Sequence, residues 1–294
     1  MNKAVALLNE PAEGLNVVDL KKALLRSLLV MAWAVEARDP YTGGHLWRVS
    51  QLAGLLAGAA GLEEQDVARV VIGGFLHDLG KIAVPDSILT KAERLTEQEF
   101  SVIRTHPDAG WQLIKEHPLA DLVEASIRAH HETPDGKGYP RGLTVDDIPV
   151  VAKIVGICDA FDAMTSTRPY RQGMAIEKAL SIIEANLGTQ FDRVLGTLFV
   201  QHGKAGKFEH IVSHSDHGIP LLSCMVCGPV MVRQRHQKAG DHVYCRSCSG
   251  DYVLAADQSN QLNVTFTGGF VPADRHSNAA DSSVIEDLIR QFLP

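Results

Sequence analysis

Two stretches decide the interpretation of this chain: HDLGKIAVPDSIL at residues 77–89 and HHETPDGKGYPRGL at residues 130–143. The first opens on a His-Asp pair and the second on a His-His pair, and each pair follows residues with helical periodicity. Two adjacent side chains at a helix end can direct two donor atoms to one place, and an aspartate can bridge two ions. The two stretches therefore predict a metal site built between helix ends.

Three further residues, His45, His106 and Asp159, are candidates for the same site. A single histidine on a helix is more often a hydrogen-bonded core or surface residue than a ligand. Asp159 is harder to explain in this way, because an ionised carboxylate in the apolar run IVGICDAFDAM is costly to bury unless it is paired or bound to a metal. Nitrogen and oxygen ligands without a thiolate suit a pair of Fe, Mn or Zn ions. The predicted ligands are His45, His77, Asp78, His106, His130, His131 and Asp159.

Two such ions, roughly 3.5–4 Å apart, can share a hydroxide nucleophile and clamp the attacking and leaving oxygens of a phosphoester. Lys81 lies one helical turn beyond His77 and Asp78, where its charge can neutralise a phosphate oxygen or assist a leaving group. A lysine that only balances the dipole at a helix C-terminus is the alternative, and it is compatible with that role. We predict Asp78 and Lys81 as catalytic residues.

Residues 18–205 have a helical pattern almost throughout. A first helix begins near Asp19, a second opens at Gly43-Gly44, and a third starts after Leu62 and ends at Gly80. Thr96-Glu97-Gln98-Glu99 predicts a capping box. The fold class is mainly α, an all-helical domain followed by a small β module. The predicted boundaries are an N-terminal segment 1–20, a helical domain 21–205, a solvated linker 206–220, a cysteine module 221–268 and a tail with a short helix 269–294.

Together, the two stretches closely resemble the double signature of the HD-GYP family, a branch of the HD phosphohydrolases. The similarity continues through ARDPYTGGHLWRV (37–49), CDAFDAMTSTRPYR (158–171) and GTQFD (188–192). The resemblance implies an all-helical phosphodiesterase with iron or manganese, which opens cyclic di-GMP to pGpG. A second round would yield GMP, and the sequence leaves the choice between these two final products open. It assigns one metal to His45, His77 and Asp159, the other to His106, His130 and His131, and the bridge to Asp78.

Some members of that family hold a third metal through a carboxylate four residues before the first histidine ligand. Here that position is Tyr41, so we expect a dinuclear site, although Glu36 and Asp39 are carboxylates nearby.

The substrate contacts are predicted from the loop Asp135–Pro140 and from the helix that carries Asp159. The loop is a turn by its chemistry, since Gly136 and Gly138 permit positive φ. The resemblance places it beside the active site and places arginines against the substrate. Helix-end solvation or a salt bridge is the alternative for the arginines, and Asp162 could instead orient Lys81 or stand behind a metal ligand. The predicted contacts are Gly138, Tyr139, Asp162, Arg168 and Arg171.

Composition excludes several other classes of protein. Lys and Arg number 28 and Asp and Glu number 35, giving a net charge of −7, without the broad basic surface of a duplex-DNA binder. The longest apolar candidate, Ser27 to Val35, is too short to cross a bilayer, which takes roughly 20 residues. No secretory signal is evident at the N-terminus. We expect a cytoplasmic protein without a membrane partner.

Near the C-terminus, Cys224-Met-Val-Cys227 and Cys245-Arg-Ser-Cys248 are separated by 17 residues. Two such pairs predict one structural zinc in a zinc-ribbon-like module, with redox-active thiols as the alternative. The module has almost no net charge, which gives little support to nucleic-acid binding, and we expect it to dock a protein partner or to self-associate. For the whole chain, the alternatives are the same chemistry on another cyclic dinucleotide or nucleoside phosphate, or a non-catalytic cyclic di-GMP-binding regulator.

Overall fold

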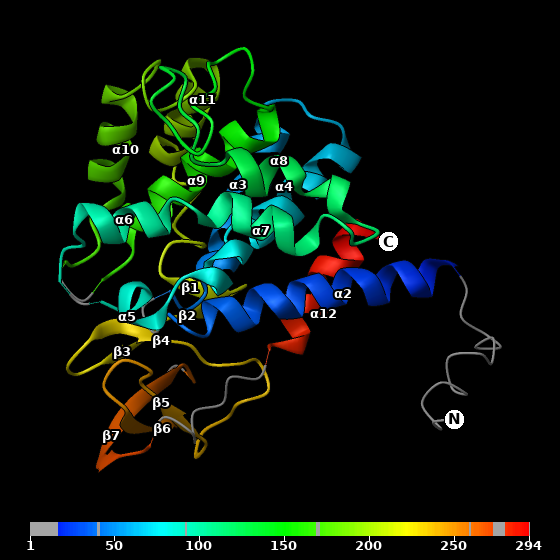
Figure 1. Ribbon diagram of the computed structural model, residues 1–294. Coiled ribbons are helices and arrows are strands. Elements are labelled where there is room, and N and C mark those ends of the chain that lie inside the picture. Colours follow the sequence, from blue (N-terminus) through cyan, green and yellow to red (C-terminus); the bar gives the residue numbers. More distant parts are fainter. Residues whose placement is uncertain are drawn as a thin grey trace.

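The computed structural model describes residues 17–39, 42–91, 93–168, 171–258, 260–272 and 280–293. The described chain forms a helical body with a small β module against one end of it (Figure 1). The longer helices of the body are α2 (Val17–Glu36), α3 (His45–Ala59), α4 (Glu64–Leu76), α7 (His106–Ile114), α9 (Val150–Thr165), α10 (Ile176–Ala185) and α11 (Arg193–Lys204). Shorter helices are η1 (Leu79–Ala83), α5 (Asp86–Leu89), α6 (Glu97–Ile103), η2 (Ala120–Leu122) and α8 (Glu124–Ala129).

Local sequence signals agree with most helix boundaries. The capping box forms at the start of α6, where Thr96 accepts from the Glu99 N–H and the Glu99 carboxylate accepts from the Thr96 N–H. The predicted end of the third helix at Gly80 is wrong, because α4 ends at Leu76 and the chain then tightens into η1. The change of direction brings Gly80 against α7, so that Asp78 points into the body instead of continuing a helix face.

The apolar faces of α3, α4 and α9 form the centre of the body. Val49, Phe75, Ile154 and Phe161 from these helices are completely buried. Such burial, at roughly 25 cal/mol per Å² of apolar surface, is the main source of stability for helices of this length. These three helices position four of the metal-ligand candidates. His45 is the first residue of α3, His77 and Asp78 directly follow α4, and Asp159 lies within α9.

The segment predicted as a solvated linker, 206–220, joins the two parts of the chain but is packed against the body. Phe208 and Ile211 are buried in the helical core. The segment then forms β1 (His214–Asp216), which pairs antiparallel with β2 (Ile219–Pro220) and contacts α3. Apolar residues spaced three apart were too few to predict this burial from the sequence.

The β module consists of two small antiparallel sheets. One is the pair β3 (Leu222–Cys224) and β4 (Gly228–Met231), and the other has the order β5 (His242–Tyr244), β6 (Gly250–Ala256) and β7 (Leu262–Phe270). After the module, α12 (Ser282–Phe292) returns to the body and packs on α2 and α4 (Figure 1). The predicted terminal helix is therefore present, and it belongs to the helical core.

Across the residues placed by the structure, we find no helix with the length and hydropathy that crossing a bilayer requires.

Candidate metal centre and its surroundings

Helix ends bring the predicted ligands together in one buried cluster, here called the His/Asp cluster. His77 and Asp78 follow α4, and the adjacent His130-His131 pair follows α8. His45 is the first residue of α3 and His106 the first of α7, whereas Asp159 lies within α9. The cluster is composed of His45, His77, Asp78, His106, His130, His131 and Asp159.

Asp78 lies between two groups of histidines. Its Oδ2 atom is 3.6 Å from Nε2 of His45 and 3.4 Å from Nε2 of His77. Its Oδ1 atom is 3.4 Å from Nε2 of His106. In each group, a set of ligand atoms lies within 4.8 Å of one another: His45, His77 and Asp78 on one side, and His106, His130 and His131 on the other. One carboxylate thus turns one oxygen toward each group, as a bridging ligand does.

Asp159 belongs to the first of these groups. Its Oδ1 atom is 3.5 Å from Nε2 of His45 and 3.8 Å from Nε2 of His77. Its side chain keeps some exposure to solvent, unlike the histidines beside it. The first group therefore has two carboxylates, Asp78 and Asp159. The second group has only Asp78, which it shares with the first.

Hydrogen bonds to the other ring nitrogens orient the histidines. Nδ1 of His77 is 2.7 Å from the carbonyl oxygen of Gly74, Nδ1 of His106 is 2.8 Å from that of Ile103, and Nδ1 of His130 is 2.7 Å from that of Ser126. A carbonyl only accepts, so the Nδ1 atoms donate and the Nε2 atoms face the cluster. Such bonds are typical behind metal-binding histidines.

The Nε2 atoms fit a cation better than they fit one another. Among the described residues, the buried Nε2 of His77 has no hydrogen-bond partner. The Nε2 atoms of His106 and His130 lie 3.1 Å apart, and with both Nδ1 atoms donating, two lone pairs face each other. A positive ion between the rings would relieve this repulsion, so the donor set fits divalent metals.

The electrostatics of the two groups differ. Burial lowers the pKa of His106 to about 4 and that of His131 to about 3, so these rings are neutral at pH 7. Burial acts in the same direction on His77, but the carboxylates of Asp78 and Asp159 raise the pKa of His77 to about 10. In the metal-free protein a proton on His77 supplies positive charge that a metal ion would supply instead.

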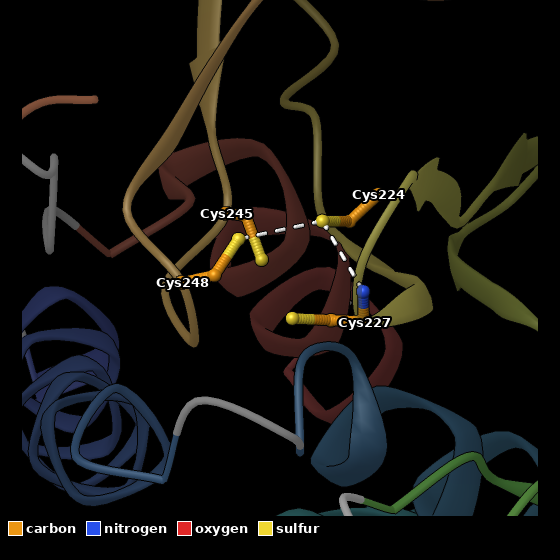
Figure 2. A group of neighbouring side chains, drawn as sticks. All are labelled: Cys224, Cys227, Cys245 and Cys248. Carbon is orange, nitrogen blue, oxygen red and sulfur yellow. Dashed lines mark hydrogen bonds between the residues drawn. The ribbon is translucent and has the colours of Figure 1, made fainter. Parts of the chain in front are cut away.

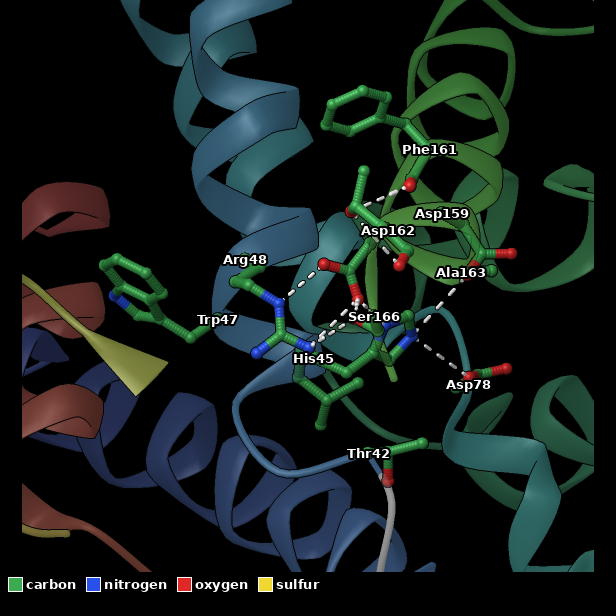
Figure 3. Close-up of polar contacts among 12 residues, drawn as sticks. Thr42, His45, Trp47, Arg48, Asp78, Asp159, Phe161, Asp162, Ala163 and Ser166 are labelled. Atoms are coloured by element: carbon green, nitrogen blue, oxygen red, sulfur yellow. Dashed lines mark hydrogen bonds and ion pairs between the residues drawn. The ribbon is translucent and has the colours of Figure 1, made fainter. Parts of the chain in front are cut away.

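Behind His45, a buried ion pair fixes the ring (Figure 3). Nδ1 of His45 lies 2.7 Å from Oδ2 of Asp162, and Arg48 donates from Nε to the other oxygen at 2.6 Å. Asp162 and Arg48 are each 1% exposed. The prediction that Asp162 contacts substrate is therefore wrong, and the alternative of a carboxylate behind a ligand holds. Arg48 was missed, because a single arginine in a helical pattern looks like a solvated residue.

Glycines allow the ligand-bearing segments to approach closely, and they too were missed. A Cβ atom on Gly80 would lie 1.8 Å from the carbonyl oxygen of His106, and one on Gly156 would lie 2.5 Å from that of His130. Glycine within an otherwise apolar helical run is the available signal, since it marks a close backbone approach. These contacts set the distance of η1 from α7 and of α8 from α9.

Lys81 and Arg168 line a cleft of about 720 Å³ next to the cluster. Nζ of Lys81 is 2.6 Å from Oδ2 of Asp78, and Arg168 pairs with Asp39 at 3.6 Å. Arg171 is not among the residues that line this cleft, and it donates to the carbonyl oxygens of Met164 and Ala163 at the end of α9. The predicted substrate contact of Arg171 is thus corrected to the helix-end alternative.

The loop 135–140 covers the second histidine group. The ring of Tyr139 stacks on that of His131 with centroids 4.6 Å apart, and its N–H donates to the His131 carbonyl oxygen. A Cβ atom on Gly138 would lie 2.4 Å from the backbone nitrogen of Thr133, so the loop needs glycine here. Tyr139, His131 and Asp159 line a second cleft, of about 340 Å³.

The position predicted for a third-metal ligand, Tyr41, lies outside the described residues. Of the nearby carboxylates, Glu36 accepts from the Leu46 N–H at 2.9 Å at the start of α3, and Asp39 pairs with Arg168.

Four of the five cysteines gather in the module, and we call Cys224, Cys227, Cys245 and Cys248 the cysteine cluster (Figure 2). Their sulfur atoms lie within 4.8 Å of one another, and those of Cys224 and Cys248 are 3.5 Å apart. Sulfurs around a tetrahedral zinc are separated by about 3.8 Å, given Zn–S bonds of about 2.3 Å. Burial would raise the pKa of Cys224, but hydrogen bonds from Tyr252 and two backbone N–H groups lower it to about 7. The cluster has the geometry and polarity of a zinc site.

The family model described as HD domain matches residues 30–195, more than half of the chain. The chain belongs to the HD domain family. This match confirms the resemblance drawn from the two signature stretches, and the matched residues contain every member of the His/Asp cluster. The cysteine cluster lies outside the matched HD domain.

Curated relatives match between about half and two thirds of the chain. "Cyclic di-GMP phosphodiesterase response regulator RpfG" of Xanthomonas campestris pv. campestris is 42% identical over 164 residues, 55% of this chain and 43% of the relative. "Cyclic di-GMP phosphodiesterase" of Thermotoga maritima is 36% identical, over 64% of this chain and 51% of the relative. "3'3'-cGAMP-specific phosphodiesterase 3" of Vibrio cholerae is 39% identical, over 54% of this chain and 34% of the relative. The chain spans about half the length of these relatives or less.

Proposed function

We propose that this protein is a metal-dependent phosphodiesterase that hydrolyses cyclic di-GMP to the linear dinucleotide pGpG. The assay below distinguishes this product from GMP, which a second round of hydrolysis would give. The observation that carries the proposal is Asp78, whose two carboxylate oxygens face two separate groups of histidines. That arrangement suits the hydrolysis of a phosphodiester by a pair of metal ions. The names of two of the relatives, cyclic di-GMP phosphodiesterases, support this choice of substrate.

His45, His77 and Asp159 would hold one divalent ion, His106, His130 and His131 the other, and Asp78 both. Iron or manganese suits these nitrogen and oxygen donors. When bound, the pair supplies an activated water and Lewis acidity toward the phosphate. The Nδ1 hydrogen bonds described above hold the histidine rings in fixed orientations, so the rings need little rearrangement when the metal ions bind.

The residues around the cluster would bind and orient the substrate. Lys81, which reaches both Asp78 and the larger cleft, would neutralise a non-bridging phosphate oxygen or the leaving oxygen. Arg168 in the same cleft would bind the second phosphate. Tyr139 and Gly138 would contact a base or the sugar-phosphate from the second cleft. The ring of Tyr139 also limits the access of bulk water to His131.

Anaerobically purified protein, incubated with cyclic di-GMP and either Fe(II) or Mn(II), tests the proposal by chromatography of the products. We expect metal-dependent formation of pGpG or GMP. Asp78→Asn should lower the rate on the order of 10³-fold, because the loss of a shared ligand removes several kcal/mol of stabilisation. Asp66→Asn, on an exposed carboxylate of α4 that pairs with Arg69, is the matched control. Protein that holds two metals and forms no product contradicts the proposal.

A second substrate deserves a parallel assay, since a relative at 39% identity is named as specific for 3'3'-cGAMP. Cyclic dinucleotides differ in their bases and share the ring of two phosphodiesters, to which the cluster and Lys81 are directed. Rates for cyclic di-GMP, 3'3'-cGAMP and a nucleoside phosphate, measured side by side, decide the preference. Tight binding of cyclic di-GMP without turnover in metal-loaded protein would favour the non-catalytic regulator.

For the module we propose one structural zinc in the cysteine cluster. We also propose that the protein is located in the cytoplasm, where thiols stay reduced. We also propose that the loop between the first two cysteines docks a protein partner or a second copy of the chain. Met225 and Val226 at its tip are 79% and 75% exposed. Replacing both with serine should abolish self-association in analytical ultracentrifugation, and a monomeric wild-type protein would leave only the partner version.

A further inference from the structure

The residues directly before His45 lie against the β module, in spaces where a larger residue does not fit. A Cβ atom on Gly43 would lie 2.7 Å from Cγ2 of Val232 and 3.3 Å from the carbonyl oxygen of Val230. A Cβ atom on Gly44, whose φ is +74°, would lie 2.7 Å from Cα of Ser215 in β1. Real Cβ atoms do not approach other atoms so closely, so only glycines allow the loop directly before α3 to lie this close to residues 215–232.

Arg48 links the same region to the His/Asp cluster. Its Nε and Nη2 groups donate to the two oxygens of Asp162 at 2.6 and 3.1 Å, and Nη2 also donates to Ser166 at 3.1 Å. Its Nη1 group donates to the carbonyl oxygens of Gly43 and His214, both at 2.9 Å. All five N–H donors of the guanidinium are therefore satisfied.

The acceptor on His214 belongs to β1, beyond residue 195, where the match to the HD domain ends. Trp47, the neighbour of Arg48 on α3, makes a T-shaped contact with His217 in the turn after β1, with centroids 5.2 Å apart. On the far side of β1, Arg235 of the module pairs with Asp216 and with Asp287 of α12. Residues 214–217 thus contact the first turn of α3 at Trp47 and Arg48. Through Arg48 they are linked to Asp162, the partner of His45.

We infer that residues 214–232, which lie beyond the HD domain, position His45 for metal binding. They act through the Gly43-Gly44 loop and through Arg48. Arg48 is a positioning residue, since it touches Asp162 and not the reacting atoms. The inference rests on the proposed function only in taking the His/Asp cluster as a metal site. Its consequence is that the HD domain of this chain owes the affinity of one of its two metal positions to residues outside that domain.

Titration of the full chain with Mn(II), followed by electron paramagnetic resonance, tests the inference without an activity assay. The His/Asp cluster is first freed of metal, while the cysteine cluster keeps its zinc, on which the fold of the module depends. Wild-type protein should bind an exchange-coupled pair of ions. Gly43→Ala introduces the Cβ atom that collides with Val232, and it should weaken binding of the ion at His45 about tenfold, as changes behind a metal ligand do. Gly58→Ala is the matched control on the same helix, because no described atom lies within 4 Å of the added Cβ.

A compensating substitution separates the contact with the module from a general effect of the loop. Val232→Ala removes the colliding Cγ2 atom, so Gly43→Ala combined with Val232→Ala should regain most of the lost affinity. Cys248→Ser, which removes a thiolate of the module, is a second variant in case Gly43→Ala does not fold. It should also weaken the ion at His45, with the ion at His106 unaffected.

An unchanged Mn(II) titration in folded Gly43→Ala, or in Cys248→Ser, overturns the inference. So does a weakened titration that Val232→Ala fails to restore. Wild-type protein that binds two Mn(II) ions but leaves cyclic di-GMP intact overturns the proposed function alone. Wild-type protein that binds fewer than two ions overturns both.

Discussion

The His/Asp cluster and the cysteine cluster hold their ligands by different means. Most ligands of the His/Asp cluster stand at helix ends, and Asp159 lies within α9. The apolar faces of these helices form a large core without the ligands. The described core of the module has eight buried residues, and two of these are the ligands Cys224 and Cys245. With the metals proposed above, an ion would complete a preformed site in the helical body, whereas the zinc would be part of the fold in the module.

Removal of the zinc should give the largest effect and separates the two regions most clearly. A thiol-modifying mercurial should release the ion and unfold β5, β6 and β7, because structural zinc supplies roughly 10 kcal/mol or more to such a module. The helices α4 and α9 should keep their protection. Hydrogen exchange with mass spectrometry measures both regions in one sample. Equal loss of protection in α9 would show that the body also depends on the ion.

Arg48→Ala tests whether the body tolerates a defect behind its ligands. The substitution leaves the buried Asp162 without its cation, which should lower the free energy of unfolding of the metal-free protein by about 3–5 kcal/mol. Arg290→Ala, at an exposed pair with Asp287, should cost less than about 1 kcal/mol. Urea denaturation measures both. A small effect of Arg48→Ala would mean that water replaces the guanidinium.

Gly80→Ala tests how closely the body must be packed to form its site. The new Cβ atom would collide with the carbonyl oxygen of His106, so η1 and α7 must separate. We expect a loss of about 1–3 kcal/mol in unfolding free energy. Gly58→Ala should instead be neutral or stabilising, since it adds helix propensity without a contact. Thermal unfolding of the two variants checks the difference, and equal melting temperatures would refute it.

The pH dependence of metal binding should differ between the two halves of the His/Asp cluster. His77, whose pKa lies at about 10 in the metal-free protein, carries a proton at neutral pH that an entering ion must displace. Affinity on that side should rise about tenfold per pH unit between about pH 7 and 9. His106 and His131 are already neutral there, so the other side should not respond. Mn(II) titrations at stepped pH measure this, and parallel curves for both ions would contradict it.

The sequence predicted what depends on short-range patterns. The capping box at Thr96 and Glu99, the terminal helix at 282–292 and the paired ligands at helix ends are all local features, and the structure brings those ligands into one cluster.

The remainder depends on contacts between segments far apart in the chain. Arg48 meets Asp162 across 114 residues and His214 across 166, and no periodicity indicates such partners. Arg171 is oriented by its hydrogen bond to a carbonyl oxygen at the end of α9. The sequence does not distinguish an arginine in this role from one that faces the substrate. Burial of Phe208 and Ile211 likewise depends on the body that receives them.

The return of α12 to the body has a further consequence. The chain leaves the buried helical core at Ile211 and re-enters it at Val284. Both segments that flank the module are therefore anchored in the same helical body. A module tethered twice is presented to the Gly43-Gly44 loop at a high effective concentration, set by the scaffold and not by a flexible connection. Even a weak intrinsic affinity between module and loop is then enough to keep the two in contact, and a modest change within the module is enough to release them.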